Sequence, residues 1–373
     1  MDKIGLSIIC FLISICSHAA NSVPPTGEFS IGTTTYFLID SSRAETLTKQ
    51  VDDYRRIVVQ AFYPTVKPEN CEVQLALPYA DKIAYANCLD SPVLTIKNEE
   101  KYPVVILSPG FGGSFLMNMS LAEELASQGY YVLNIGHTFF NSTPAFSDGK
   151  KIELLSMDTL TMDTDNFLDS KFKLRLNTYI KIQKNDIVSV LDNLSGMLDE
   201  SQQKAVDIEN ITCIGYSGGG ATAAEICIED KRIKAGININ GVLYGDAWKD
   251  SISCPFLYIN ADYSSPRKSE IEIQGGQHVI DSIMQFYNYR KLLFSQKSTN
   301  DFYELTLTNT THQNFSDYAL VDQEYCGRTN PKKCLQLTYR YILLFLDKYQ
   351  KSQSSSELSS DLLDKNCKFT VVK

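Results

Sequence analysis

The segment that most constrains this chain is a strand that runs into a glycine-rich turn and then into a helix. Residues 208–214 read as a buried strand, residues 215–219 read GYSGG, and residues 221–229 have a helical pattern. A Gly-x-Ser-x-Gly turn between a strand and a helix is typical of a strained elbow that exposes a nucleophilic serine. Gly215 and Gly219 leave room where a side chain would clash. We therefore take Ser217 as the candidate nucleophile; the alternative is a tight turn with an inert serine.

The rest of the chain alternates between strands and helices after an antiparallel start. Residues 104–107 form a continuous apolar run, as expected for a strand buried on both faces, and a helix and a second strand follow within residues 120–136. This βαβ pattern predicts a single α/β domain with a mostly parallel central sheet flanked by helices. Residues 138–170 lack periodicity and are rich in Thr, Ser and Asp. We expect them to form a lid or an elaborated loop over a site.

A serine nucleophile needs a base, and only four histidines are available, of which His18 lies in the N-terminal apolar segment. His137 precedes Ser217 in the chain, which is the wrong order for this kind of site, and His278 opens an amphipathic helix. His312 follows the strand FYELTLTN and lies in the loop TNTTHQNFSDY. Loops at the carboxyl ends of parallel strands carry catalytic groups, so His312 is the predicted base.

The imidazole in turn needs an acid that sets its tautomer, and the oxyanion needs two N–H donors. Asp262 directly follows the strand CPFLYIN and lies between the serine and the histidine in chain order; Asp246 is the alternative. We predict one oxyanion donor at Gly218, the residue after the nucleophile. The other is predicted at Phe111, in the glycine-rich loop SPGFGGS that follows residues 104–107.

Five segments together resemble one family: PVVILSPGFGG, GYSGGG, GININ, LYINADY and THQNFSDY. They are similar to α/β-hydrolases of the platelet-activating-factor acetylhydrolase type (plasma and intracellular type II), and the resemblance extends over residues 101–349. It implies an α/β-hydrolase fold with Ser217 as nucleophile, His312 as base and oxyanion donors at Phe111 and Gly218. In that family the acid follows the earlier strand, where this chain has Asn240, and Pro109 replaces the usual histidine of the oxyanion loop.

An asparagine at the acid position would hold the wrong tautomer of the histidine. We therefore place the acid at Asp262, one strand later, as in polyester hydrolases and other secreted esterases of this fold. The expected function is a secreted, cofactor-free and metal-free serine ester hydrolase of lipase or carboxylesterase type that acts on short-chain or lipid-like esters, including phospholipids. The alternatives are a polyester or xenobiotic ester hydrolase, and a catalytically inactive hydrolase fold that serves as a binding protein.

Charge and the N-terminal segment bear on partners and compartment. The formal charge is −9 and no basic stripe is present, which argues against a nucleic-acid partner, whereas peripheral contact with lipid surfaces is compatible with the sequence. Residues 1–20 read as a secretory signal, with an uncleaved anchor as the alternative, and imply secretion or periplasmic export. Residues 21–350 form the predicted hydrolase domain, and residues 351–373 a flexible tail. In an oxidising compartment we expect the disulfides Cys71–Cys88 and Cys326–Cys334.

Overall fold

The structure is a computed structural model that describes most of the chain. The described residues are 23–66, 86–94, 100–156, 159, 170–273, 275–352, 358 and 364–372. The predicted signal segment and Cys71 lie outside these ranges, and so does much of the second half of the predicted lid.

In the described part of the chain, a ten-stranded sheet forms the centre of the protein, in the order β10-β9-β8-β7-β6-β4-β5-β2-β1-β3. Neighbouring strands are parallel from β5 through β4, β6, β7 and β8 to β9. This confirms the predicted, mostly parallel sheet of an α/β-hydrolase fold. The strands are β1 (Ser30–Ala44), β2 (Tyr54–Thr65), β3 (Asn87–Leu89), β4 (Tyr102–Ser108), β5 (Tyr131–His137), β6 (Val206–Tyr216), β7 (Ile233–Ile239), β8 (Phe256–Ala261), β9 (Phe302–Leu307) and β10 (Cys367–Val371).

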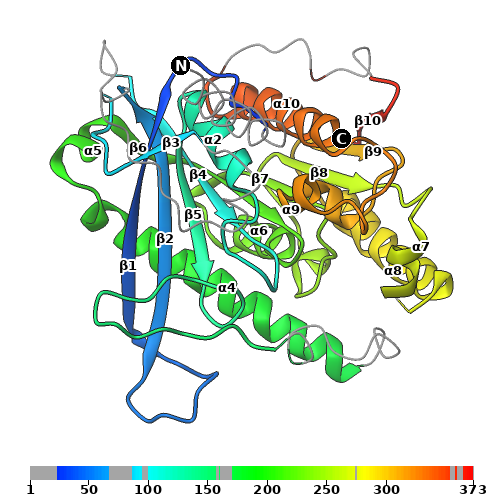
Figure 1. Ribbon diagram of the computed structural model, residues 1–373, viewed down its shortest axis with the longest axis horizontal. Coiled ribbons are helices and arrows are strands. Elements are labelled where there is room, and N and C mark those ends of the chain that lie inside the picture. The colour runs from blue at the N-terminus through cyan, green and yellow to red at the C-terminus, as the bar shows by residue number, and fades with distance from the viewer. Residues whose placement is uncertain are drawn as a thin grey trace, which may run out of the picture.

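Helices cover both faces of the sheet, and the alternation of side chains along each strand explains why (Figure 1). In β4, Val105 and Leu107 enter one hydrophobic cluster, whereas Val104 and Ile106 enter the other. The first face packs against α2 (Met119–Ser127) and α10 (Pro331–Tyr349), the second against α4 (Ser170–Met197), α6 (Gly218–Glu229) and α8 (Gln277–Gln296). A strand buried on both faces must be apolar throughout, as the run of residues 104–107 is.

The remaining helices are short and lie in the connections. They are α5 (Glu200–Ala205), α7 (Lys268–Ile273), α9 (Tyr318–Val321) and the 3₁₀ turns η3 (Ala247–Lys249) and η4 (His312–Phe315). None of the helices in the described part of the chain combines the length and apolarity needed to cross a bilayer.

The C-terminal segment differs from the expected flexible tail. Strand β10 pairs antiparallel with β9, from Cys367 opposite Leu307 to Val371 opposite Tyr303, and so closes that edge of the sheet. Phe369 is buried against the aromatic rings of Tyr303 and Tyr341. The alternation of Cys, Phe and Val with polar residues in this segment is typical of a strand. This strand supplies hydrogen-bond partners to the backbone of β9.

The predicted disulfide Cys326–Cys334 is wrong. Both residues are buried and neither is disulfide-bonded. The Sγ of Cys326 hydrogen-bonds to the carbonyl oxygen of Asp322, while Cys334 lies within α10, so the short spacing in sequence does not join the two thiols. Cys88 is disulfide-bonded, and its predicted partner Cys71 lies outside the described residues.

Candidate active site

Ser217 lies in a strained turn between β6 and α6, as the glycine pattern indicates. Its backbone angles are φ 57° and ψ −122°, which a serine seldom adopts, and its N–H donates to the carbonyl oxygen of Ile239 at 3.0 Å. A Cβ on Gly215 would lie 1.9 Å from the carbonyl oxygen of Gly219, and a Cβ on Gly219 would lie 1.9 Å from that of Ser108. Only glycine fits at either position, so the turn depends on both.

His312 stands directly against this serine. It opens η4 after β9, and its Nε2 lies 2.9 Å from the Oγ of Ser217. The ring of Tyr216 stacks on the imidazole with centroids 5.0 Å apart, and the Tyr216 hydroxyl donates to the carbonyl oxygen of His312 at 3.1 Å. Burial, partly offset by a hydrogen bond to the backbone of Asn240, lowers the pKa of His312 to about 4. The imidazole is therefore neutral at neutral pH, the state that a general base needs.

Asn240 occupies the position on the far side of the imidazole. It follows β7, its Nδ2 lies 2.8 Å from Nδ1 of His312, and its Oδ1 accepts a hydrogen bond from the N–H of Ala261 at 3.0 Å. Asp262, the acid that the chain order predicts, lies at the end of β8 with its carboxylate turned to other groups. It accepts from the Ser264 hydroxyl at 2.6 Å and from the backbone N–H of Thr310 at 3.3 Å. The structure therefore brings Ser217, His312 and Asn240 together, and places Asp262 in the neighbouring loop.

The alternative acid, Asp246, forms an ion pair with Lys249 at an exposed site. Of the two aspartates that the sequence offers, Asp262 is thus the nearer to the histidine loop, since it anchors Thr310 two residues before His312.

The predicted oxyanion loop lies beside the nucleophile. A Cβ on Gly110 would be 2.7 Å from the Cβ of Ser217, so the backbone of this loop reaches the serine closely. Gly218 is the first residue of α6, where N–H groups have no partner within the helix. The N–H of Gly112 donates to the carbonyl oxygen of Phe140 at 2.8 Å, and the Asn141 side chain donates to the carbonyl oxygen of Gly110 at 2.7 Å. Residues 140–142 therefore hold the loop in place.

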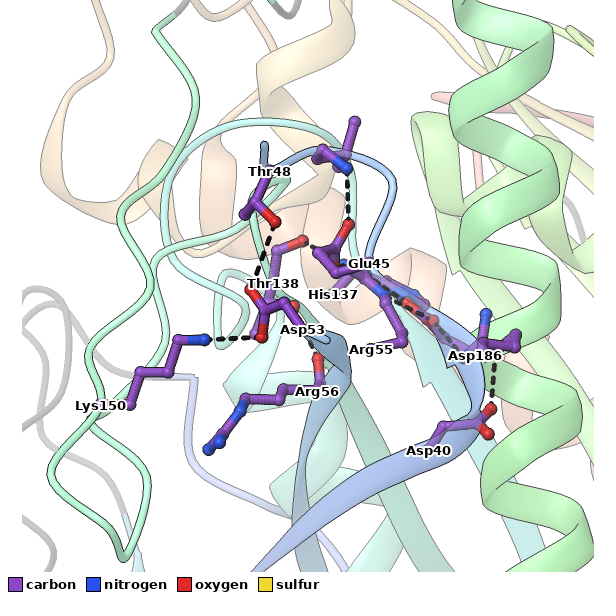
Figure 2. A network of polar contacts seen from close by, with 12 residues as sticks. Asp40, Glu45, Thr48, Asp53, Arg55, Arg56, His137, Thr138, Lys150 and Asp186 are labelled. Atoms are coloured by element: carbon purple, nitrogen blue, oxygen red, sulfur yellow. Dashed lines mark hydrogen bonds and ion pairs between the residues drawn. The ribbon is translucent and has the colours of Figure 1, made fainter. Parts of the chain in front are cut away.

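Behind this loop lies a buried polar network that sequence reasoning missed (Figure 2). The Nε2 of His137 lies 3.1 Å from the Oγ of Ser108, and its Nδ1 lies 2.9 Å from the carboxylate of Asp186 on α4. Arg55 on β2 donates to the same carboxylate through Nε and Nη2, at 2.9 and 2.6 Å. Asp186 lies on the apolar face of the helical pattern, four residues before Val190, and a charge at such a position was the available signal.

This second group of serine, histidine and aspartate is not a second reactive site. Ser108, His137 and Asp186 are 2%, 0% and 0% exposed, so a substrate has no access to them. Burial lowers the pKa of His137, which keeps the ring neutral beside Arg55. The network fixes the carboxyl ends of β4 and β5, from which the oxyanion loop and its support at residues 140–142 depart.

An aromatic wall completes the surroundings of the site. The ring of Phe111 packs against Phe140 and Tyr179, with centroids 5.7 and 6.0 Å away, and the three belong to one apolar cluster with Phe172 and Tyr244. No group of three or more His, Cys, Asp or Glu side chains in the described ranges is arranged to hold a metal ion. The arrangement suits acyl transfer from an apolar ester to a serine.

Several known proteins are similar to this chain in sequence or in fold. The family model described as platelet-activating factor acetylhydrolase, isoform II, matches residues 82–366, well over half of the chain. The chain is 24% identical over 293 residues to a platelet-activating factor acetylhydrolase of Bos taurus, covering 72% of this chain and 62% of the relative. It is 28% identical over 145 residues to a probable 1-alkyl-2-acetylglycerophosphocholine esterase of Arthroderma benhamiae, covering 39% of this chain and 33% of the relative.

A solved structure shows the same fold. It is a ferulic acid esterase from Streptomyces cinnamoneus, with a TM-score of 0.73 and 22% sequence identity, covering 93% of this chain and 98% of the esterase. The matched part of this chain spans about three fifths of the length of the bovine relative.

Proposed function

The chain belongs to the platelet-activating factor acetylhydrolase isoform II family, and on this premise we propose that it is a serine ester hydrolase. The observation that carries the proposal is the 2.9 Å contact between the Oγ of Ser217, in a strained elbow, and the Nε2 of His312. A serine hydroxyl becomes a useful nucleophile only with such a base at hydrogen-bond distance.

The proposed mechanism uses four groups of the site. His312 takes the hydroxyl proton of Ser217 as Oγ attacks the ester carbonyl, and the N–H groups of Phe111 and Gly218 stabilise the resulting oxyanion. His312 then gives the proton to the leaving alcohol, and an acyl-enzyme remains. Water attacks the acyl-enzyme with His312 again as base, which releases the carboxylic acid and restores Ser217.

Asp262 has a proposed role through the loop that carries the base. Its carboxylate anchors the N–H of Thr310, so its loss would let His312 move relative to Ser217. The direct partner of the imidazole is Asn240. The predicted Ser-His-Asp triad therefore remains a proposal. In it, Asp262 does not contact the imidazole but holds the loop that carries His312.

The proposed substrate is a short-chain or lipid-like acyl ester. The names of the curated relatives support a phospholipid ester, and the aromatic wall of Phe111, Phe140 and Tyr179 suits an apolar acyl or alkyl group. Tyr289 and Leu292 on α8 are 58% and 53% exposed, which supports peripheral contact with a lipid surface.

We also propose that the protein is exported. Disulfides persist in oxidising compartments, and Cys88 is disulfide-bonded. The apolar segment at residues 4–16 supports the same proposal.

A second candidate function rests on one specific observation. Asn240 in place of an acid against His312 favours a hydrolase fold that binds an acyl ligand without turning it over. Steady-state hydrolysis of p-nitrophenyl acetate, p-nitrophenyl butyrate and a 2-acetyl phospholipid by the wild type and by Ser217→Ala separates the two. Turnover that disappears in Ser217→Ala supports the esterase, whereas binding of the phospholipid without turnover by either protein supports the second candidate.

A further inference from the structure

We propose that Asn240 holds His312 in the tautomer that cannot deprotonate Ser217, within a pocket whose hydrogen-bonding groups suit a carboxylate. This inference deepens the proposed esterase function and rests on it. In this proposal Asn240 is a positioning residue that limits the rate of ester hydrolysis. The proposal follows from the orientation of the Asn240 side-chain amide between Ala261 and His312.

The orientation of the Asn240 amide is fixed from outside the site. The N–H of Ala261, at the end of β8, can only donate, and it points at Oδ1 of Asn240 from 3.0 Å. The amide nitrogen must then face Nδ1 of His312, at 2.8 Å. The backbone cannot shift to relieve this arrangement, because the N–H of Asn240 is itself bonded to the carbonyl oxygen of Ile259 at 2.7 Å.

This orientation decides the tautomer of His312. An amide NH₂ group only donates, so the Nδ1 that it meets presents its lone pair and the ring proton sits on Nε2. The opposite tautomer would turn Nδ1–H away from the amide and toward the backbone of Asn240, which also hydrogen-bonds to the imidazole. With the ring proton on Nε2, the Nε2–H points at the Oγ of Ser217, 2.9 Å away. In that state Nε2 has no free lone pair for the serine proton, and Ser217 accepts a hydrogen bond from the base instead of giving one. The same mismatch explains why an amide in place of the acid is costly in other triads.

A reversed amide restores the productive tautomer but at a cost. If Oδ1 turned to His312, the NH₂ group would face the buried N–H of Ala261, which is 2% exposed, and that hydrogen bond would be lost. Leaving a buried backbone donor unpaired lowers the population of a state by roughly 5- to 150-fold. The competent arrangement is therefore a minor state of the wild-type protein.

An aspartate at this position has no such conflict. One carboxylate oxygen would accept from the N–H of Ala261 and the other from an Nδ1–H of His312, which frees Nε2 to accept the Ser217 proton. Asn240 has φ 51°, a left-handed conformation that aspartate tolerates as well as asparagine does. The substitution Asn240→Asp is also isosteric, so the pocket accepts it without repacking.

The kinetic test compares four proteins on p-nitrophenyl acetate: wild type, Asn240→Asp, Asn240→Asp with Ser217→Ala, and Gln313→Glu. We expect kcat/KM of Asn240→Asp to exceed wild type by at least about 100-fold, toward the ~10⁴-fold effect of the reverse change in a serine protease. The added Ser217→Ala change must abolish the gain. Gln313→Glu, which brings the same charge beside His312, should change kcat/KM by less than about threefold. Equal activity of wild type and Asn240→Asp would overturn the proposal.

A control must show that the wild-type rate comes from protein with an intact Asn240. Asn240 is followed by Gly241, and an Asn-Gly pair is prone to deamidation because glycine does not hinder attack of its nitrogen on the amide. Deamidation releases ammonia through a cyclic imide, and water opens this imide to aspartate, which is the variant, or to isoaspartate. Peptide mass mapping of residue 240 must therefore accompany each rate, and wild-type activity that scales with its deamidated fraction supports the proposal.

A spectroscopic readout tests the tautomer without any variant or turnover. In ¹⁵N-histidine-labelled wild type, the nitrogen shifts of His312, assigned by their loss in His312→Gln, should show the proton on Nε2. A proton on Nδ1 in wild type would overturn the proposal, even if Asn240→Asp failed to fold. If the tautomer is as expected but folded Asn240→Asp neither hydrolyses esters nor reacts with a fluorophosphonate, the proposed esterase function fails and the tautomer assignment stands.

Discussion

Removing the carboxylate of Asp186 should destabilise the protein far more than removing an exposed carboxylate from the same helix. Asp186 is 0% exposed and accepts hydrogen bonds from Arg55 and, at 2.8 Å, from Arg43, besides its contact with His137. Among the described residues, Asp186→Ala leaves the guanidinium of Arg55, 2% exposed, with Glu45 as its remaining ionic partner. Breaking a buried pair on one side costs about 3–5 kcal/mol of unfolding free energy.

The matched control is Asp192→Ala, on the same helix. Asp192 pairs with Arg232 at 2.7 Å, but the two side chains are 57% and 38% exposed, so its loss should cost about 0–1 kcal/mol. Urea unfolding at pH 7, followed by circular dichroism, measures both. A loss of less than about 1 kcal/mol in Asp186→Ala, or a loss no larger than that of Asp192→Ala, would contradict this expectation.

The same carboxylate should make stability depend on pH in the acid range. Burial alone would raise the pKa of Asp186, but the charge and hydrogen bonds of Arg55 outweigh burial and hold the pKa below its usual value. A lowered pKa contributes stability that is fully present above the unfolded-state value near 3.8 and is lost as the pH falls through the folded value. The difference in unfolding free energy between wild type and Asp186→Ala should therefore be constant from pH 5 to 7 and shrink below about pH 4.

Three further predictions concern the site and the cysteines. Because burial lowers the pKa of His312 to about 4, kcat/KM for an uncharged ester should rise with pH through about 4 and then level off; an acid limb near pH 6.5 would contradict this. Gly110→Ala should reduce kcat/KM by at least about 100-fold, since the added Cβ lies 2.7 Å from that of the nucleophile, whereas Gly196→Ala, with open space around it, should leave it unchanged. Cys326 and Cys334 should both alkylate when the protein is unfolded without reductant, and protection of either would restore the predicted disulfide.

The fold and two residues of the site, Ser217 and His312, could be predicted from the sequence for physical reasons. A strand buried on both faces must be apolar throughout, so the apolar run at residues 104–107 indicates a parallel sheet. The elbow at Ser217 leaves space only for glycine on both sides, which makes its pattern visible without a structure. His312 follows from the order of the chain and from the loop that carries it.

The partner of the histidine could not be read in the same way. Asn240 and Asp262 follow adjacent parallel strands, β7 and β8, and both strands end at the same edge of the sheet. Which of the two side chains reaches Nδ1 depends on turns of one or two residues, and here Asp262 turns its carboxylate to Ser264 and Thr310. The buried Asp186 network could not be predicted for a related reason, because its members come from five separate elements, β1, β2, β4, β5 and α4.

The site of covalent modification by a fluorophosphonate probe shows directly whether Ser217 is the nucleophile. The folded wild type, Asn240→Asp and Ser217→Ala proteins are treated with the probe and mapped by peptide mass spectrometry. We expect a single adduct on Ser217, formed much faster in Asn240→Asp than in wild type, and none in Ser217→Ala. An adduct that persists in Ser217→Ala, or no adduct in folded Asn240→Asp, would contradict the claim that Ser217 is the nucleophile of an ester hydrolase.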